Sequence, residues 1–281
     1  MAAKAAKAAK FPMTTIGGLK ISRLIIGSNM FGGFSHMTAA RDRWLRNYFT
    51  VERIAEVLEA CSARGLNAMV SGAVPKFYDA LRMHEDKTGR KIHWIVTPGG
   101  GGQVGGTIVE EIDWAAKHAV DYILPHPCWT DVRLVVEKKE ILGLDEVIKH
   151  VRGHGMIPGV STHQPETVIV CDKRPYDVET YIQILNVAGF LMHVETEWCS
   201  KVVRNAKHPV ICIKPMASGR VMPSVGFRWT YENSKPVDTI AAGFMSTEEA
   251  EEDIDICLEV LTGKKRTEEL QVTRSKRALV Q

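Results

Sequence analysis

The chain has 281 residues, of which 45% are hydrophobic and 25% are charged, and its formal net charge is +3. This composition is ordinary for a globular protein, and it excludes a mainly disordered, collagen-like or small disulfide-stapled protein. So small a charge gives no reason to expect nucleic acid as a partner. No stretch of the sequence reaches the roughly 18 apolar residues of a membrane-spanning helix, so no membrane association is expected.

Short apolar runs typical of buried strands alternate with helical runs along the chain. The candidate strands are 22–28, 66–72, 93–98, 121–126, 156–162, 180–186, 209–215 and 238–244. The candidate helices are 51–65, 76–89, 107–119, two pieces within 131–155, 164–170, 195–206, 225–232 and 246–263. This alternation predicts an α/β protein with a (β/α)8 TIM barrel. A doubly wound sheet is the competing architecture, but no phosphate-binding turn follows the first strand.

We expect one barrel over residues 13–263, a flexible tail over 1–12 and a basic tail over 264–281. The first twelve residues lack the apolar core of a secretory signal. Six cysteines are scattered singly and form no C-x-x-C pair, so zinc-ribbon and thioredoxin-like motifs are not expected. Unpaired thiols of this kind are typical of a reducing compartment, and we expect a cytoplasmic protein.

In such barrels the reactive side chains follow the C-terminal ends of the strands. The polar and aromatic residues that this rule selects are Asn29, His36, His126, Trp129, His163, Gln183, Asn186, Glu195 and Lys214. Trp129 has two interpretations, as a platform for a sugar ring or as packing between a loop and a helix.

Two histidines, His126 and His163, follow strands that are adjacent in the predicted barrel. With Glu195 they have the composition of a two-histidine, one-carboxylate face for a divalent metal ion. The alternative is that each histidine makes a structural hydrogen bond. Lys214 follows a buried strand, where lost hydration lowers a lysine pKa. We favour a role for it in substrate binding and electrostatics over covalent chemistry.

The segment PGGGGQVGG, residues 98–106, places Gly100, Gly102 and Gly105 at the spacing of a dinucleotide-binding fingerprint. The match is weak, because no acidic residue ends the following strand where a ribose partner should stand. We interpret the segment as a mobile lid or as a place where the backbone approaches a ligand closely.

A family resemblance is carried by segments that occur in the same order over about 20–263. They are GGLKISRLIIGSNMFGG, ARGLNAMVSG, VDYILPH, GMIPGVSTHQPETV, IKPMASGRV and DTIAAGFMSTEEAEEDI. Together they resemble the aldo-keto reductases. The resemblance implies a (β/α)8 barrel of the aldo-keto reductase type and a nicotinamide-dependent ancestry.

The family's activity depends on an aspartate, a tyrosine, a lysine and a histidine, and most of these are missing here. Ser71 stands at the aspartate position, Pro98 stands at the lysine position, and Tyr78 is an uncertain match to the tyrosine. Only the histidine is retained, as His126. The resemblance therefore implies a barrel without an obvious device for reducing a carbonyl group.

The cofactor positions of the family are altered as well. Gln183 matches the cofactor glutamine, but Ile213 replaces the stacking tyrosine, and an acidic helix start after Ser246 would repel a phosphate. NAD(P) is therefore less favoured than a divalent metal ion of unknown identity.

We expect an enzyme that acts by acid–base chemistry on a small, sugar-like polyhydroxylated substrate, as an isomerase, epimerase, lyase or hydrolase. The expected catalytic residues are His126, His163, Lys214 and Glu195. The expected binding residues are Asn29, His36, Trp129, Gln183 and Asn186. Two alternatives stay open, an NAD(P)-dependent oxidoreductase with a rewired tetrad and a non-catalytic binding subunit. The sequence is also compatible with a homo-oligomer.

Overall fold

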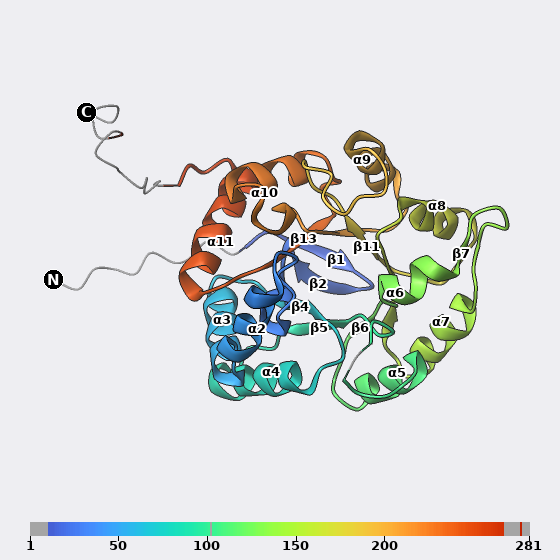
Figure 1. Ribbon diagram of the computed structural model, residues 1–281, viewed down its shortest axis with the longest axis horizontal. Helices are drawn as coiled ribbons and strands as arrows, with labels where there is room; N and C mark the ends of the chain where they lie inside the picture. Colours follow the sequence, from blue (N-terminus) through green and yellow to red (C-terminus); the bar gives the residue numbers. More distant parts are fainter. Residues whose placement is uncertain (1–10, 102, 267–275, 277–281) are drawn as a thin grey trace.

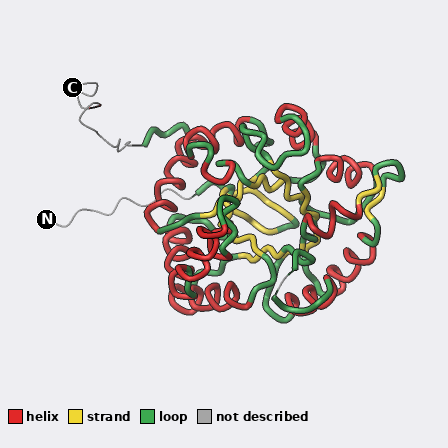
Figure 2. Tube along the Cα trace, in the orientation of Figure 1, coloured by secondary structure: helices red, strands yellow, loops and turns green. Residues whose placement is uncertain are grey.

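The computed structural model describes residues 11–101, 103–266 and 276. Most of the tails predicted over 1–12 and 264–281 lies outside these residues, as does Gly102 of the glycine-rich segment. The described residues form a central ring of strands surrounded by helices (Figures 1 and 2).

All eight predicted barrel strands are present in the described residues, paired in parallel. Around the sheet they are β10 (Val160–Thr162), β11 (Tyr181–Ile184), β12 (Val210–Ile213), β13 (Thr239–Gly243), β3 (Leu24–Gly27), β4 (Ala68–Ser71), β5 (His93–Val96), β6 (Tyr122–Ile123) and β9 (Ile157–Pro158). The two outer members of this order, β9 and β10, are separated only by Gly159, so they are two halves of one predicted strand.

The break at Gly159 is where the barrel closes. The Gly159 N–H donates to the carbonyl oxygen of Ile123 on one side at 2.9 Å, and the Val160 N–H donates to that of Thr180 on the other side at 3.1 Å. A Cβ at position 159 would lie 2.6 Å from the Thr180 carbonyl oxygen. Only glycine permits this close approach of three strands. The prediction of a (β/α)8 barrel is therefore confirmed.

The helices surround the sheet as an outer layer (Figure 1). They are α1 (Asn29–Gly32), α2 (Ala39–Tyr48), α3 (Val51–Ala63), α4 (Pro75–Thr88), α5 (Ile108–Ala116), α6 (Pro127–Thr130), α7 (Leu144–Gly153), α8 (Pro165–Lys173), α9 (Thr196–Asn205), α10 (Pro223–Glu232) and α11 (Thr247–Thr262). Thr50, Thr107 and Ser246 cap α3, α5 and α11 with their hydroxyl oxygens, which satisfies backbone N–H groups that the helix leaves free. Within the described residues, no helix is both long and apolar enough to cross a bilayer.

Alternating side chains of the strands fill the inside of the barrel. Ile25, Ile95, Ile182 and Ile211 belong to this inner cluster. The opposite faces of the same strands pack against the helices in a larger outer cluster. Burial on both faces explains why these strands are near-continuous apolar runs in the sequence.

An antiparallel hairpin, not predicted from the sequence, covers one end of the barrel. Its strands are β1 (Met13–Ile16) and β2 (Leu19–Ser22), and it lies across the centre of the ring in Figure 1. Ile16 and Ile21 complete the inner apolar cluster, and the Tyr122 hydroxyl donates to the Ile16 carbonyl oxygen at 2.9 Å. Because Tyr122 begins β6, the hairpin covers the N-terminal ends of the strands and leaves the other end as the mouth.

The prediction of two helical pieces within 131–155 is wrong in its first half. A 3-10 turn, η1 (Asp131–Arg133), leads into a hairpin of β7 (Leu134–Val135) and β8 (Glu140–Ile141), and only α7 is helical. The β-branched run Val132, Val135 and Val136 favours extended backbone. Lys139 and Gly143 then take positive φ angles, which a continuous helix does not allow.

The first described residue, Phe11, belongs to the folded core, although the sequence analysis placed it in the tail over 1–12. Phe11 is 2% exposed and packs in the outer apolar cluster. A Cβ on Gly65 would lie 3.2 Å from the backbone nitrogen of Phe11. The carbonyl oxygen of Pro12, the residue after Phe11, accepts a hydrogen bond from the Arg23 N–H at 2.9 Å.

We predict that Phe11→Ala lowers the free energy of unfolding by about 3–5 kcal/mol, because it leaves a cavity that the packed core cannot fill. Urea denaturation measures this change. Phe34→Ala is the matched control, since the Phe34 side chain is 60% exposed and its loss should cost no more than about 0.5 kcal/mol. Equal effects of the two substitutions would contradict the buried position of Phe11.

Candidate functional site

The mouth of the barrel brings together side chains from four strand ends. Lys214 follows β12, His36 lies between α1 and α2 after β3, His126 follows β6, and His163 follows β10. β6 pairs with β9, the first half of the β9–β10 strand, so the predicted adjacency of the strands that carry His126 and His163 is confirmed.

Lys214 is held on unusual backbone. Its φ angle is 61°, and Ala217 and Ser218 in the same turn have φ angles of 47° and 57°. His36, which faces Lys214, has a φ angle of 53°. Each such conformation of a residue other than glycine costs on the order of 1–3 kcal/mol and is concentrated at functional sites. The strain therefore marks this part of the mouth for a role other than stability.

The Lys214 ammonium contacts an imidazole instead of a carboxylate. Its Nζ lies 3.2 Å from Nε2 of His36, and Nδ2 of Asn29 lies 3.2 Å from the same nitrogen. Because Nζ and Nδ2 are both donors, Nε2 must accept, and the neutral His36 ring carries its proton on Nδ1. Burial and the nearby Lys214 charge lower the pKa of His36, which favours this neutral form.

Burial lowers the pKa of Lys214 itself to about 8. No carboxylate of the described residues lies within 4.0 Å of its ammonium to offset the lost hydration. A lysine with this pKa exchanges a proton close to neutral pH, unlike an exposed lysine. The environment therefore makes Lys214 a candidate acid–base group.

The other two histidines face the same charge. Burial, and after it the charge of Lys214, lowers the pKa of both rings, and that of His163 falls to about 3. Nδ1 of His126 accepts from the Cys128 N–H at 3.2 Å, so a neutral His126 carries its proton on Nε2 and can donate it to a ligand. The mouth thus combines one titrating cation with neutral imidazoles.

A carboxylate and a glycine fix the two histidines in place. The Asp131 carboxylate accepts from the His163 N–H at 3.0 Å and from the Thr162 hydroxyl, which ties the end of β10 to η1. On the other side, a Cβ at Gly100 would lie 2.7 Å from Cγ of His126. The glycine-rich segment therefore approaches the His126 ring closely.

The predicted three-ligand metal face is not assembled. Glu195 is exposed at the N-terminal boundary of α9. Among the described residues, the only cluster of three or more histidine, cysteine or carboxylate side chains with ligand atoms within 4.8 Å of one another is elsewhere, at Asp113, His150 and His154. His126 and His163 therefore lack Glu195 as a third ligand in this structure.

Three of the predicted binding residues have structural contacts instead. Gln183 follows Ile182 of the inner cluster, so the strand alternation points it outward, where its Nε2 lies 3.6 Å from Sγ of Cys199 in α9. The buried Asn186 amide bonds the backbone of Phe190 in both directions, at 3.0 and 2.9 Å. Trp129 is 9% exposed, and the Arg133 guanidinium stacks 4.4 Å from its ring centre.

The side chains at two of the family's tetrad positions, Ser71 and Tyr78, also make structural contacts. The Ser71 hydroxyl accepts from the Trp94 indole N–H at 2.7 Å and donates to the Gly72 carbonyl oxygen at 2.9 Å. Tyr78 lies in the helical layer, with its ring 4.7 Å from that of His118. Neither side chain joins the group around Lys214.

Two residues of the mouth were missed from the sequence. The Arg220 guanidinium lies 4.2 Å from the centre of the Phe190 ring, and Phe190 in turn meets the His36 ring at 6.3 Å. Both residues lie several positions beyond their strand ends. A search confined to strand ends does not reach them, and although Arg220 lies in the segment IKPMASGRV, the resemblance implies no role for it.

Comparison with known proteins rests on structure, because neither protein-family models nor curated proteins gave a match. A solved structure from Pseudomonas aeruginosa assigned as an aldo-keto reductase is 13% identical, covers 92% of this chain and 99% of its own, and has a TM-score of 0.64. A glycerol dehydrogenase from Gluconobacter oxydans is 13% identical over 92% of this chain and 99% of its own, with a TM-score of 0.56. A variant of Gox0644 in complex with NADPH is 10% identical over 88% of each chain, with a TM-score of 0.59.

The chain has the aldo-keto reductase fold. The resemblance inferred from sequence is therefore confirmed at the level of the fold. At identities this low the likeness does not extend to activity, which must be argued from the site itself.

We predict that Lys214→Met raises the pKa of both His126 and His163, because it removes a positive charge that disfavours their imidazolium forms. Long-range ¹H–¹⁵N NMR titration of the histidine rings measures both values. Lys117→Met, at an exposed lysine just after α5, is the control and should leave them unchanged. Unaltered pKa values in Lys214→Met would show that the three side chains do not share one site.

Proposed function

We propose that the mouth is the active site of a non-redox enzyme that transfers protons on a small polyhydroxylated carbonyl compound. Isomerisation or epimerisation is the favoured reaction. The observation that carries the proposal is the environment of Lys214, a half-buried amine with a pKa of about 8 that faces neutral imidazoles and no carboxylate among the described residues. A general acid–base group works best when its pKa lies near the operating pH.

The roles follow from the hydrogen-bonding state of each group. The neutral Lys214 amine takes the proton from the hydroxyl-bearing carbon next to the substrate carbonyl, and the resulting ammonium returns it to the former carbonyl carbon, which isomerises the substrate. Return to the original carbon after the planar intermediate has turned over gives the epimer. In the isomerisation, the Nε2–H of His126 passes to the carbonyl oxygen, where negative charge develops, and the ring recovers a proton from the neighbouring hydroxyl, whose oxygen becomes the new carbonyl. Asn29 and His36 fix the position of the Lys214 amine.

The substrate class follows from the polar character of the mouth. Hydroxyl groups both donate and accept hydrogen bonds, and His163 and His36 present neutral rings suited to such partners. The ammonium form of Lys214 and the neighbouring Arg220 favour a substrate with oxygen-rich or anionic groups. Since the predicted metal ligands are not assembled here, no step of this mechanism passes through a metal ion.

An NAD(P)-dependent oxidoreductase is the second candidate, and it is favoured by the likeness to reductases, one of them in complex with NADPH. The family's phosphate position, at the start of α11, fits that cofactor poorly. The Glu249 carboxylate accepts from the Met245 N–H, and the Ser246 hydroxyl accepts from the Glu249 N–H. These N–H groups are already satisfied, and Glu248 and Glu249 add negative charge.

The proton-transfer proposal predicts exchange of carbon-bound hydrogen with D2O in a panel of aldoses and ketoses of three to six carbons, followed by ¹H NMR. Lys214→Met should slow the exchange by at least about 100-fold, as expected for loss of a positioned general base. The exposed-lysine control Lys117→Met should retain the wild-type rate. Exchange that is unaffected by Lys214→Met would contradict the proposal.

We further predict that NADPH and NADH show no saturable binding up to about 1 mM, which corresponds to a binding free energy weaker than about −4 kcal/mol. Quenching of tryptophan fluorescence, checked by calorimetry, measures it. Saturable binding in the micromolar range would instead favour the oxidoreductase.

A further inference from the structure

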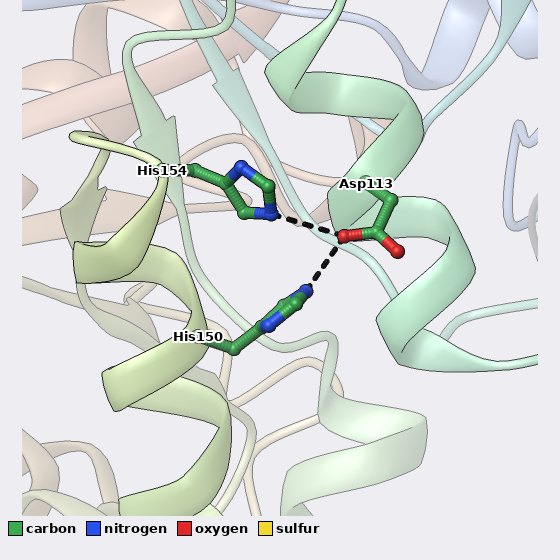
Figure 3. Close-up of side chains that lie close together, drawn as sticks. All are labelled: Asp113, His150 and His154. Atoms are coloured by element: carbon green, nitrogen blue, oxygen red, sulfur yellow. Dashed lines mark hydrogen bonds and ion pairs between the residues drawn. The ribbon is translucent and has the colours of Figure 1, made fainter.

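A second cluster of titratable side chains lies in the helical layer, outside the site described above. Asp113 of α5 faces His150 of α7 and His154, which follows α7 at its C-terminal boundary (Figure 3). Nε2 of His150 lies 2.7 Å from Oδ1 of Asp113, and Nε2 of His154 lies 3.0 Å from the same oxygen. The two rings stand nearly perpendicular, at 88°, with centres 4.9 Å apart.

The sequence spacing explains why the two rings converge. Residues four apart on a helix lie on the same face, one turn above the other, and this face of α7 packs toward α5. A single hydrogen bond between the two helices would need only one histidine. Here both Nε2 atoms point to one carboxylate oxygen, so three ligand atoms surround one point (Figure 3).

We propose that Asp113, His150 and His154 bind a divalent transition metal ion, with zinc the favoured ion and water completing the coordination. Two imidazole nitrogens and one carboxylate oxygen form a ligand set that zinc prefers.

The distances from the two Nε2 atoms to Oδ1 fit such an ion after a small adjustment. In tetrahedral coordination, ligand atoms about 2.1 Å from zinc lie about 3.4 Å from one another. The two Nε2–Oδ1 distances of 2.7 and 3.0 Å therefore need to widen by well under 1 Å, roughly the range of a side-chain rotation. On binding, each ring loses to solvent the Nε2 proton that it donates to Oδ1, takes the form with its proton on Nδ1 and presents the Nε2 lone pair.

The cluster is open to an ion from solvent. The side chains of Asp113, His150 and His154 are each about one-third to two-fifths exposed, at 42%, 34% and 36%. A surface pocket of about 430 Å³ adjoins them, lined by Glu146, Lys149, His150, Gly153 and His154. It leaves room for water, and the opposite charges of Glu146 and Lys149 balance each other there.

The cluster is separate from the mouth. In this barrel the helices run back alongside the strands, so the C-terminal end of α7, where His154 lies, leads to the N-terminal end of β9. That is the end opposite to Lys214. A metal ion here would join α5 to α7 and stabilise the outer layer, with no part in the chemistry of the mouth.

The test is isothermal titration calorimetry of the full chain, without a histidine tag and after dialysis against EDTA, with zinc chloride. We expect one ion per chain with micromolar affinity, and a rise in melting temperature on binding. His154→Gln, at the more exposed of the two histidines, and Asp113→Asn should each weaken binding by at least about tenfold. Melting curves in EDTA confirm that the variants are folded.

The matched control is the double variant His126→Gln/His163→Gln, which removes the same number of histidines from the mouth. It should bind zinc like the wild-type chain. Loss of zinc binding in this control with retention in His154→Gln would overturn the proposal and place the ion at the mouth. Absence of zinc binding to the wild-type chain at 100 μM, roughly 5.5 kcal/mol of binding free energy, would also overturn it.

Discussion

The chemistry of the mouth depends on the desolvation of a single cation. Lys214 carries its charge where the barrel excludes much of the water, and its nearest polar partner is the accepting nitrogen of His36. A carboxylate at this distance would hold the lysine protonated and give an ordinary ion pair. No carboxylate of the described residues takes that place to offset burial, so the pKa of the lysine falls, and burial together with the Lys214 charge lowers the pKa of His36, His126 and His163.

The barrel stabilises this otherwise unfavourable arrangement. Left-handed backbone at Lys214, Ala217 and Ser218 is unfavourable at each position, and a half-buried cation without a carboxylate partner among the described residues adds to the cost. The strand before the turn, β12, is paired on both sides and lies between two apolar layers. The packed sheet, covered on both faces, offsets the strain of the turn that follows β12. Parallel barrels commonly carry their functional residues on such turns at the C-terminal ends of the strands.

The sequence predicted the barrel well because burial on both faces forces each strand into a recognisable apolar run, such as Ile211 to Ile213. It predicted the site less well. The end of a strand fixes the position of a residue in the barrel, but the direction of its side chain depends on the pleat of the strand. Gln183 shows this: Ile182 belongs to the inner cluster, so the alternation places Gln183 on the outside.

Other parts of the site could not be read from the sequence at all. The contact between His36 and Lys214 joins residues 178 positions apart and depends on positive φ angles at both, which no composition signals for histidine or lysine. The hairpin that replaces a predicted helix after Arg133 is a milder case, because Val135 and Val136 suit both a helix face and a strand.

The position of the polar groups also separates this barrel from the reductases it resembles. On the β4 and β5 side, where the resemblance places the aspartate and lysine of the tetrad, Ser71 is bonded to Trp94 and Pro98 has no side-chain donor. The charged group lies instead on β12, and its partner His36 follows β3, with only β13 between these strands. His126 remains at its place after β6. In the proposed reaction, a carbonyl oxygen bound at His126 would have Lys214 beside its neighbouring carbon, across the mouth from the side that the tetrad would occupy. The arrangement thus keeps a histidine at the tetrad position after β6 and places the titrating group on the other side of the mouth.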